Sequence, residues 1–337
     1  MAKNSTDFKA VILAGGSGER FWPLSTPEQP KQFLRVFGGE SLIRQSVTRL
    51  LGLVRFEDVY VVTSKDLVNA TRRELPEIPA KNIIGEPMRR DTGAAVAAGV
   101  GLAGAGGDGV VGFFPSDQMV AAPIRFRATV KRAIARAAKG PQIVTIGIRP
   151  TFPATGFGYV DPEAGRFVEK PDLRRAKAYL KDGFLWNAGM FIAQTSTFRS
   201  AFASYAPDLV SLCDGGESVK GARFRELYEA MPKVSFDVAV MEPFSQAGGV
   251  AVVPGDFGWD DVGSFAAFDT YFPHDSRGNV REGPCTVVEA DNNICVARSA
   301  RISLLGVKNL VVVTTKDAVR VAEKSRISEM KKLFKKG

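Results

Sequence analysis

A short apolar segment that breaks into closely spaced glycines is the feature of this chain that most restricts its fold. Residues 10–13 read Ala-Val-Ile-Leu, and after them come Ala14, Gly15, Gly16, Ser17 and Gly18. Three glycines within four residues let a backbone approach a ligand closely and point several N–H groups at one anion. Arg20 and Lys31 add positive charge nearby. The pattern predicts a buried strand that ends in a phosphate-binding loop, and the alternative is a turn whose glycines only relieve backbone strain.

Two common phosphate-binding patterns do not fit this loop. Gly16-x-Gly18-x-x-Phe21 lacks the third glycine of the dinucleotide fingerprint, and the sequence contains no Gly-x-x-x-x-Gly-Lys-Ser/Thr run. A literal Gly-x-Gly-x-x-Gly occurs at residues 104–109, but it leads into an apolar run instead of following one. We therefore interpret it as a flexible link, and a nicotinamide-dependent oxidoreductase is disfavoured.

Apolar segments alternate with helical segments over the first 150 residues. The patterns predict strands at 10–13, 59–63, 82–85, 110–114 and 142–148, and helices at 41–52, 66–74, 92–103 and 124–139. This alternation predicts an α/β fold with a mixed, mostly parallel, Rossmann-like sheet. Ligands of such sheets bind beyond the carboxyl ends of the strands, so the glycine loop and Asp117 are expected at one cleft.

The pattern of predicted strands and helices changes at two points further along the chain. Between residues 155 and 195, short β segments with Gly-Phe-Gly and Asn-Ala-Gly turns predict an antiparallel insertion that covers the cleft, and a helical stretch follows at about 198–231. After His274, short β segments are split by asparagine-containing turns and end in a charged helix. We expect a catalytic domain over residues 1–272 and a small β appendage with a terminal helix over residues 273–337.

Composition excludes several classes of function. The net charge is +9, but residues 316–337 contribute +5 of it without interleaved aromatics, which indicates a solvated helix face and no nucleic-acid partner. No apolar run approaches the roughly 18 residues of a membrane span, and the N-terminus has no signal-like core, so a cytoplasmic protein without membrane contact is expected. One histidine and three scattered cysteines disfavour structural zinc and a histidine-activated nucleophile.

The glycine loop belongs to a longer set of motifs that resembles a known family. Residues 13–24, read as L-A-G-G-x-G-x-R-x-W-P-L, and Pro-Lys-Gln-Phe at 30–33 resemble the signature of sugar nucleotidyltransferases, and most nearly that of the mannose-1-phosphate guanylyltransferases. Further segments match in the same order at 114–117, 155–159, 167–171, 186–191 and 259–264. The resemblance spans residues 10 to about 265. It implies the nucleotide-diphospho-sugar transferase fold with a left-handed β-helix-like appendage, which such proteins often use for subunit contacts, so a homodimer is allowed.

The resemblance implies transfer of GMP from GTP to mannose 1-phosphate with Mg²⁺ as cofactor. The phosphate of the sugar is itself the nucleophile and is ionised near neutral pH, since its second pKa is about 6, so no general base is required. Catalysis then needs positive charge, which Arg20, Lys31 and Lys170 would supply to the triphosphate and the sugar phosphate. Another nucleotide or sugar phosphate, or a non-catalytic regulatory subunit on the same fold, remains an alternative.

The family motifs also imply binding residues. The metal ligands would be Asp117 and Asp261, because W-x-D-x-G leaves Asp260 at the variable position, although a shift at the strand end could exchange the two. Sugar contacts are expected from Gly156, Glu169 and Asn187. The nucleotide is expected at the loop residues Ala14, Gly15, Gly16, Ser17 and Gly18 and at the base-side residues Glu86, Arg90 and Thr92.

Several positions depart from the family pattern. Asp91 stands where Asn is usual, Gly93-Ala94 replaces Ala-Pro, Gln118 replaces His, and Glu19 replaces a common Thr. None of them removes a predicted phosphate or metal contact, so they bear on base and sugar identity. The sequence ends where many bacterial relatives continue into an isomerase domain, so phosphomannose isomerase activity is not expected.

Overall fold

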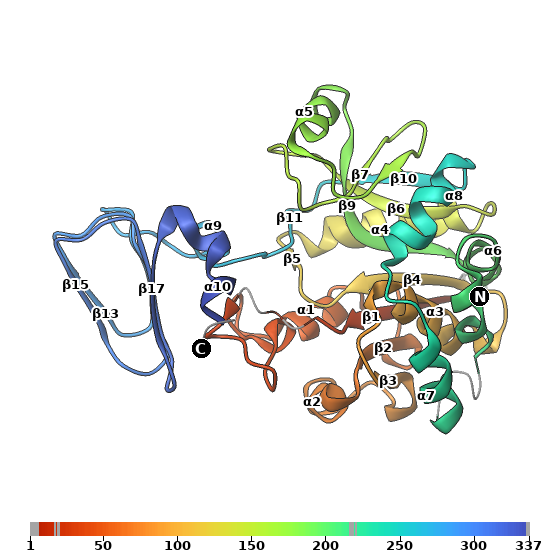
Figure 1. The fold of residues 1–337 in the computed structure, drawn as a ribbon, viewed down its shortest axis with the longest axis horizontal. Helices are drawn as coiled ribbons and strands as arrows, with labels where there is room; N and C mark the ends of the chain where they lie inside the picture. Colours follow the sequence, from red (N-terminus) through yellow and green to blue (C-terminus); the bar gives the residue numbers. More distant parts are fainter. Residues whose placement is uncertain (1–6, 17, 19–20, 216–218, 220, 335–337) are drawn as a thin grey trace. The chain divides into compact units, whose positions relative to one another are not determined.

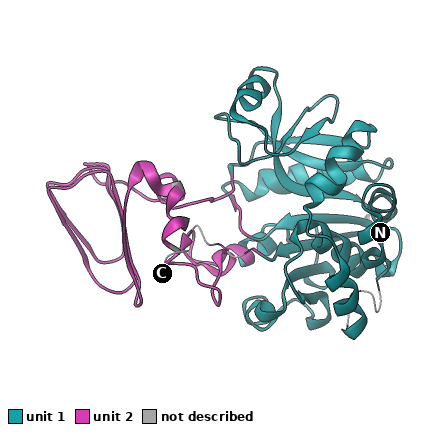
Figure 2. Cartoon of the chain, viewed as in Figure 1, with its two compact units in different colours: residues 1–15, 44–116, 120–259 teal, residues 16–43, 117–119, 260–337 magenta. Residues whose placement is uncertain are grey.

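The computed structural model describes residues 7–16, 18, 21–215, 219 and 221–334. Segments far apart in the sequence assemble into two compact units, coloured separately in Figure 2. Unit 1 comprises residues 1–15, 44–116 and 120–259, and unit 2 comprises residues 16–43, 117–119 and 260–337. Two short strands, β5 (Met119–Val120) and β11 (Trp259–Asp260), lie where the chain passes from one unit to the other.

Unit 1 is built on a mixed, mostly parallel sheet, as the alternation of strands and helices predicts. The main strands follow the order β10-β6-β9-β4-β1-β2-β3 (Figure 1). Parallel pairing joins β1 to β2 and β4, β2 to β3, and β6 to β10. The parallel strands are β1 (Phe8–Ala14), β2 (Val59–Ser64), β3 (Ile83–Glu86), β4 (Val110–Pro115), β6 (Ile143–Ile148) and β10 (Val250–Gly255).

The strand β9 (Leu185–Gln194) corrects one prediction. Residues 155–195 were expected to form an antiparallel insertion that covers the cleft, but β9 pairs antiparallel with β4 on one side and β6 on the other and so lies within the main sheet. Its residues from Trp186 to Ala193 are buried almost throughout, because a strand in this position is covered on both faces. The short strands β7 (Tyr159–Val160) and β8 (Phe167–Val168) alone match the expected antiparallel extension.

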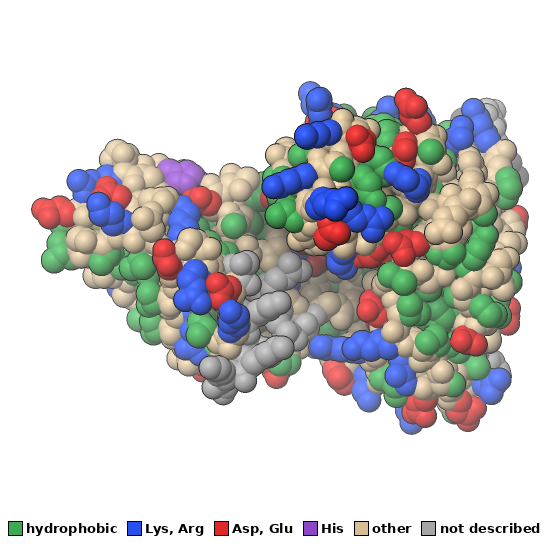
Figure 3. Space-filling model, turned by 45° about the horizontal axis from the view of Figure 1, so that its top comes forward, with side chains coloured by type: hydrophobic (Ala, Val, Ile, Leu, Met, Phe, Trp, Pro, Cys, Tyr) green, Lys and Arg blue, Asp and Glu red, His purple; other side chains and the backbone are tan. Residues whose placement is uncertain are grey.

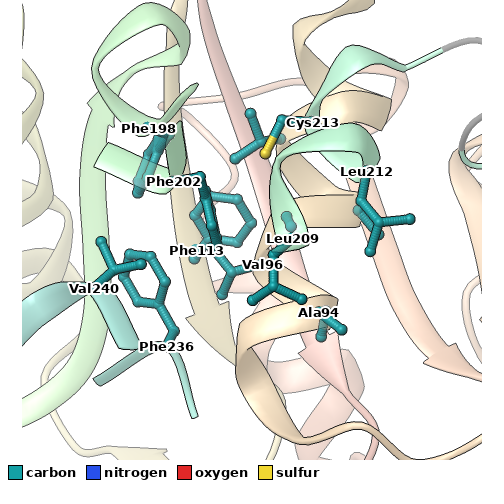
Figure 4. Packing of buried hydrophobic residues seen from close by; sticks show 14 of the residues in the cluster. Ala94, Val96, Phe113, Phe198, Phe202, Leu209, Leu212, Cys213, Phe236 and Val240 are labelled. Atoms are coloured by element: carbon teal, nitrogen blue, oxygen red, sulfur yellow. The ribbon is translucent and has the colours of Figure 1, made fainter. Parts of the chain in front are cut away.

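The helices of unit 1 pack against this sheet through small and aromatic side chains. In α3 (Asp91–Ala103) all but the first two residues are buried, and a Cβ on Gly99 would lie 2.6 Å from the ring of Phe113. Figure 4 shows Phe113, Phe198, Phe202 and Phe236 gathered in this core. The other helices are α1 (Leu42–Thr48), which begins in unit 2, α2 (Val68–Glu74), α4 (Pro123–Ala137), α5 (Leu173–Lys181), α6 (Thr195–Tyr205), α7 (Gly221–Ala230) and α8 (Glu242–Gln246).

Unit 2 holds the small β coil expected near the C-terminus. Parallel pairing joins β12 to β14 and β14 to β16, and separately β13 to β15, while β17 returns antiparallel along β16. The elements are α9 (Ala266–Tyr271), β12 (Val280–Glu282), β13 (Cys285–Val288), β14 (Ile294–Ala297), β15 (Ile302–Leu305), β16 (Leu310–Thr314), β17 (Val319–Glu323) and α10 (Lys331–Phe334). Alternation between two sheets from one strand to the next is the pattern of a β-helical coil.

Asparagine side chains hold the turns of this coil, as their positions in the sequence suggested. Asn292 and Asn309 adopt left-handed backbone angles, with φ of 55° and 56°. The amide of Asn293 donates to Asn279 Oδ1 at 2.9 Å and accepts from the backbone N–H of Leu310 at 2.9 Å. Stacked amides therefore link successive levels of the coil.

The N-terminal segment of unit 2 shares its hydrophobic core with the C-terminal strands. Phe21, Leu24 and Phe37 are buried in one cluster with side chains from α9 and from the strands β12, β14 and β16. Phe37 lies 5.4 Å from Phe268, measured between ring centroids. The segment that carries Pro-Lys-Gln-Phe is thus folded together with the β coil.

Two features of the described surface and helices bear on the class of protein. Figure 3 shows Lys and Arg side chains interspersed with Asp and Glu side chains over the face that it displays. Among the described helices, none combines the length and the apolar character needed to cross a membrane.

Candidate functional site

The end of β1 brings the glycine loop against a buried carboxylate of unit 1. A Cβ added to Gly15 would lie 2.8 Å from Oε2 of Glu86, so a larger residue at this position would require the carboxylate to move. The hydroxyl of Thr63 donates to the carbonyl of Ala14 at 3.1 Å and fixes the strand end. The predicted nucleotide residues Ala14, Gly15 and Glu86 are therefore neighbours.

Glu86 is buried and accepts a hydrogen bond from Tyr228. Glu86 is 8% exposed, and the hydroxyl of Tyr228, from α7, donates to its Oε1. Burial raises the pKa of Glu86 from 4.5 to about 7, although the hydrogen bond from Tyr228 and the charge of Arg89 act in the opposite direction. Burial, with the charge of Glu86, also raises the pKa of Tyr228, which keeps it a donor. The result is an oriented hydrogen-bond acceptor next to the loop.

Arg90 and Thr92, predicted to bind the nucleotide, contact the protein itself in the structure. The guanidinium of Arg90 donates to the backbone carbonyls of Tyr228 and Glu229 at the end of α7. The hydroxyl of Thr92 accepts from the backbone N–H of Phe236 at 2.9 Å. Asp91 has a φ of 65°, a left-handed conformation that Asn and Asp tolerate, which accounts physically for Asn in the family pattern. Both predicted residues thus hold the loop after β3 in place.

Asn187, predicted to bind sugar, lies in β9 with its amide orientation fixed. Its Oδ1 accepts from the hydroxyl of Thr145 at 2.7 Å and from the backbone N–H of Gly189 at 3.1 Å. Its Nδ2 donates to Oδ1 of Asp237 at 3.1 Å. Because the carbonyl oxygen is used by two donors, the amino group must point toward Asp237.

Glu169 and Lys170 follow β8 and form an ion pair at 2.7 Å between Oε1 and Nζ. The backbone N–H of Glu169 donates to Glu242 at 2.8 Å, and Lys170 has a φ of 40°, so the pair is held at a sharp turn. Partial burial lowers the pKa of Lys170, but the hydrogen bond and charge of Glu169 outweigh it, so the pKa stays above its ordinary value. The ammonium group is exposed and charged, as a ligand for phosphate must be.

Aromatic side chains connect three of the motifs within unit 1. The ring of Phe157 lies 5.1 Å from Trp186 and 5.4 Å from Trp259. Each of these residues comes from a different motif, and edge-to-face packing at such distances is favourable. The aromatic positions of the motifs therefore hold the predicted sugar-side loops together. A Cβ on Gly156 in the first of these loops would meet nothing within 4 Å, so its backbone is open.

In unit 2, Lys31 lies beneath the glycine loop and contacts both predicted metal-ligand positions. A Cβ on Gly18, whose φ is 64°, would lie 2.5 Å from Cβ of Lys31. The ammonium group of Lys31, a residue 5% exposed, donates to Oδ2 of Asp117 at 2.9 Å and to the backbone carbonyl of Asp261 at 2.7 Å. Gly18, Lys31, Asp117 and Asp261 are therefore brought together.

Asp260, which the family pattern leaves at the variable position, is hydrogen-bonded within its own part of the chain. Oδ1 of Asp260 accepts from the backbone N–H of Val262 at 2.6 Å, and its carboxylate also bonds to the hydroxyl of Tyr271. Asp260 thus stabilises the turn after β11. Among the described residues, no group of three or more His, Cys, Asp or Glu is placed to hold a metal. Two carboxylates completed by phosphate oxygens and water are a donor set that suits Mg²⁺, and Asp117 and Asp261 as its ligands stay a prediction.

Some predicted residues cannot be placed in this arrangement. Arg20 and Ser17 lie outside the described residues. Gly16 would meet nothing within 4 Å if it carried a Cβ. A cavity of about 1000 Å³ in unit 1 is lined by Arg125 and Arg132 of α4, by Arg149 after β6 and by residues of α5 and β10. None of the described predicted site residues is among those that line it.

Comparison with known proteins decides the family. The nucleotidyl transferase family model matches residues 9–277, and a "MannoseP isomerase/GMP-like beta-helix domain" model matches residues 283–336. A mannose-1-phosphate guanylyltransferase of Klebsiella pneumoniae is 35% identical over 96% of this chain and 72% of the relative. The chain belongs to the mannose-1-phosphate guanylyltransferase family.

Two further matches extend this family assignment. The xanthan biosynthesis protein XanB of Xanthomonas campestris is 35% identical over 97% of this chain and 73% of its own length. A crystal structure from Thermus thermophilus, titled as a mannose-1-phosphate geranyltransferase, superposes with a TM-score of 0.88 at 32% identity and covers 98% of this chain and 99% of that one. The sequence resemblance and the predicted fold class, including the β-helical C-terminal part, are thereby confirmed.

Sequence reasoning missed three polar residues that contact the family motifs in the structure. Tyr228 donates to Glu86, Asp237 accepts from Asn187, and Glu242 accepts from the N–H of Glu169. Two of them lie in a segment for which no element was predicted. A signal was present in Asp237 and Glu242, two acids within an otherwise apolar run, Phe-Asp-Val-Ala-Val-Met-Glu.

Proposed function

We propose that this chain transfers GMP from GTP to mannose 1-phosphate, forming GDP-mannose and releasing pyrophosphate. The named relatives support this activity. The observation that carries it furthest is the contact of the Lys31 ammonium with Asp117 and with the carbonyl of Asp261, which are 86 and 230 residues away along the chain. Such a concentration of charged groups from separate motifs suits the handling of polyphosphate.

The reaction in this proposal is an in-line attack of the sugar phosphate on the α-phosphorus of GTP. The attacking oxygen is already ionised near neutral pH, since the second pKa of a phosphate monoester is about 6. The protein therefore needs to position two anions and to offset the charge that develops on the phosphorus and on the pyrophosphate. Lys31 and Arg20 would act on the triphosphate, and Lys170 on the sugar phosphate.

The predicted sugar-side residues provide both hydrogen-bond donors and hydrogen-bond acceptors. The carboxylate of Glu169 accepts hydrogen bonds from hydroxyl groups, the amide of Asn187 donates, and the open backbone at Gly156 allows the ring to approach. The pairing of Glu169 with Lys170 fixes both groups before the substrate binds. Such preorganisation reduces the entropy lost on binding.

Glu86 would identify the base. Guanine presents N1–H and a 2-amino group as adjacent donors, whereas adenine presents an acceptor at N1. A buried carboxylate held by Tyr228 and close to Gly15 accepts from such donors and disfavours adenine. The glycine loop residues Gly15, Gly16 and Gly18 would present backbone groups to the phosphates, and Ala14 and Ser17 are proposed to border the same nucleotide.

Mg²⁺ is the proposed metal, held by Asp117 and Asp261. When bound, it would neutralise phosphate charge and polarise the phosphorus–oxygen bonds. Besides acting on the triphosphate, Lys31 would keep these two loops together, because its ammonium group contacts both. The cytoplasm, where nucleoside triphosphates are made, is the proposed setting. Division of the chain at residues 272 and 273 remains a prediction, as does the homodimer.

A substrate panel tests the proposal. Purified protein is incubated with each of several nucleoside triphosphates and hexose 1-phosphates in Mg²⁺, and pyrophosphate release is measured. GTP with mannose 1-phosphate should give the highest kcat/KM. No turnover with this pair would reject the proposal, whereas turnover with another pair would identify a different nucleotidyltransferase. Substitution of Asp261 or Lys170 by Ala should leave the fold intact and lower kcat/KM at least about 100-fold.

A further inference from the structure

One helical segment of unit 1, residues 237–246, contacts two of the predicted sugar-side residues and the strand β8 that precedes one of them. It consists of a π-helical turn (Asp237–Met241) followed by α8. Asp237 accepts from the Asn187 amide at 3.1 Å, and Glu242 accepts from the N–H of Glu169 at 2.8 Å. The hydroxyl of Ser245 accepts from the N–H of Phe167 at 3.1 Å. No motif used in the assignment of function includes this segment.

The backbone around Asp237 is fixed by the core. Its neighbour Phe236 and the nearby Val240 are fully buried, and Figure 4 shows both side chains within the cluster that contains Phe198 and Phe202. A π-helical turn is uncommon and occurs often at functional sites, because it changes the direction of the side chains along a helix. Here it places Asp237 beside Asn187 while its flanking residues remain in the core.

The surroundings of the Asp237 carboxylate disfavour its charged form. Burial and the nearby charge of Glu169 raise the pKa of Asp237, although Lys170 opposes this effect. Within the part of the chain that the structure describes, Asp237 makes no ion pair with a Lys or Arg, and the Asn187 amide is its side-chain donor. The residue as a whole is of intermediate exposure, so it lies at the boundary of the core beside Asn187. A carboxylate has more acceptor sites than the hydrogen bond from Asn187 uses, and this remaining capacity suits a ligand with hydroxyl groups.

We propose that Asp237 is a substrate-contacting residue that accepts a hydrogen bond from a hydroxyl group of the hexose 1-phosphate, next to Glu169 and Asn187. The inference rests on the proposed function. Two carboxylates and one oriented amino group form a set that matches a polyhydroxylated ring, because each carboxylate accepts from hydroxyl hydrogens and the amino group donates to a hydroxyl oxygen. Glu242 and Ser245 are positioning residues, because they bind the backbone of β8 and of the turn after it.

The test compares Asp237→Asn with wild type on a series of mannose 1-phosphates that each lack one hydroxyl group. Asn has the same shape but is a weaker acceptor, so KM for mannose 1-phosphate should rise about 10- to 100-fold, as expected for loss of a hydrogen bond to a charged group, while KM for GTP stays unchanged. Wild type should discriminate against one deoxy analogue, and the variant should lose that discrimination. Asp256→Asn, which changes a highly exposed carboxylate of the same unit, is the matched control and should behave as wild type.

The outcomes separate a substrate contact from a structural role. If the Asp237→Asn variant discriminates against the deoxy analogues in the same way as wild type, Asp237 only anchors Asn187 and the proposal is overturned. Circular dichroism and thermal melting check folding, and Asp237→Ser replaces the Asn variant if that variant does not fold. If wild type uses a different hexose 1-phosphate, the proposed function fails while the deoxy series of that sugar still decides on Asp237. If no hexose 1-phosphate reacts, both ideas fail.

Discussion

Replacing Glu86 by Gln should stabilise the folded protein above pH 7 and weaken GTP binding. The carboxyl group is 8% exposed, and burial raises its pKa from 4.5 to about 7. The folded state therefore holds this proton more tightly than the unfolded state. The free energy of unfolding falls as the pH rises from about 4.5 through 7. Above that range Glu86 is ionised in both states, and the loss of stability no longer grows.

The magnitude follows from the two pKa values. At about 1.4 kcal/mol for each pKa unit, the charged carboxylate costs about 3 kcal/mol at pH 8 and less than about 1 kcal/mol at pH 5. Gln has nearly the same shape and keeps an oxygen for the Tyr228 hydroxyl, but it carries no charge. The Gln variant should therefore be more stable than wild type at pH 8 by up to about 3 kcal/mol, and nearly equal at pH 5.

Urea unfolding at both pH values measures this difference, with Glu163→Gln, an exposed carboxylate of the same unit, as the control. The control should show no comparable pH trend. A stability difference between Glu86→Gln and wild type that is equal at pH 5 and pH 8 would refute the argument that a buried charge is the cause. Pyrophosphate release should show a higher KM for GTP in the Gln variant, because an amide supplies a weaker acceptor to guanine.

Four other substitutions test unit 2. Lys31→Met should lower kcat about 100-fold or more with the fold retained by circular dichroism, since it removes the cation between Asp117 and the Asp261 carbonyl, and near-normal turnover would contradict that role. Asp261→Asn should raise the Mg²⁺ concentration needed for half-maximal rate. Asp260→Asn should not raise it, because this variant retains an acceptor for the Val262 N–H. The reverse result would exchange the two assignments. Gly18→Ala should lower the thermal midpoint by several degrees, because its φ is 64° and the new Cβ would lie 2.5 Å from a Lys31 carbon, and an unchanged midpoint would show that the loop adjusts freely.

The order of strands and helices was predictable because each parallel strand carries its own apolar run and each helix a recognisable period. The position of β9 in the sheet was not predictable. Antiparallel insertion of one strand between β4 and β6 depends on long-range pairing, and Asn-Ala-Gly within residues 186–191 reads locally as a turn. Tertiary contacts buried this segment on both faces and overrode that local signal.

The candidate site was predictable in its motif residues but not in their partners. Lys31 was expected to bind phosphate, and its contact with Asp117 could not be read from residues 86 positions apart. Arg90 and Thr92 occur in the family motif, yet the structure shows their side chains bound to backbone groups near α7 and before the π-helical turn. The role of Asp237 depends on a π-helical turn, for which sequence periodicity gives no distinct pattern.

The shared core of unit 2 bears on how this protein can be shortened or recombined. Phe21, Leu24 and Phe37 bury their side chains against α9 and the strands of the β coil. A protein cut after residue 272 would expose these apolar groups to water and leave the helical turn at Lys31 without its support. The coil is therefore a structural requirement of the segment that follows the glycine loop, and exchange of C-terminal modules between relatives would have to exchange residues 16–43 with them.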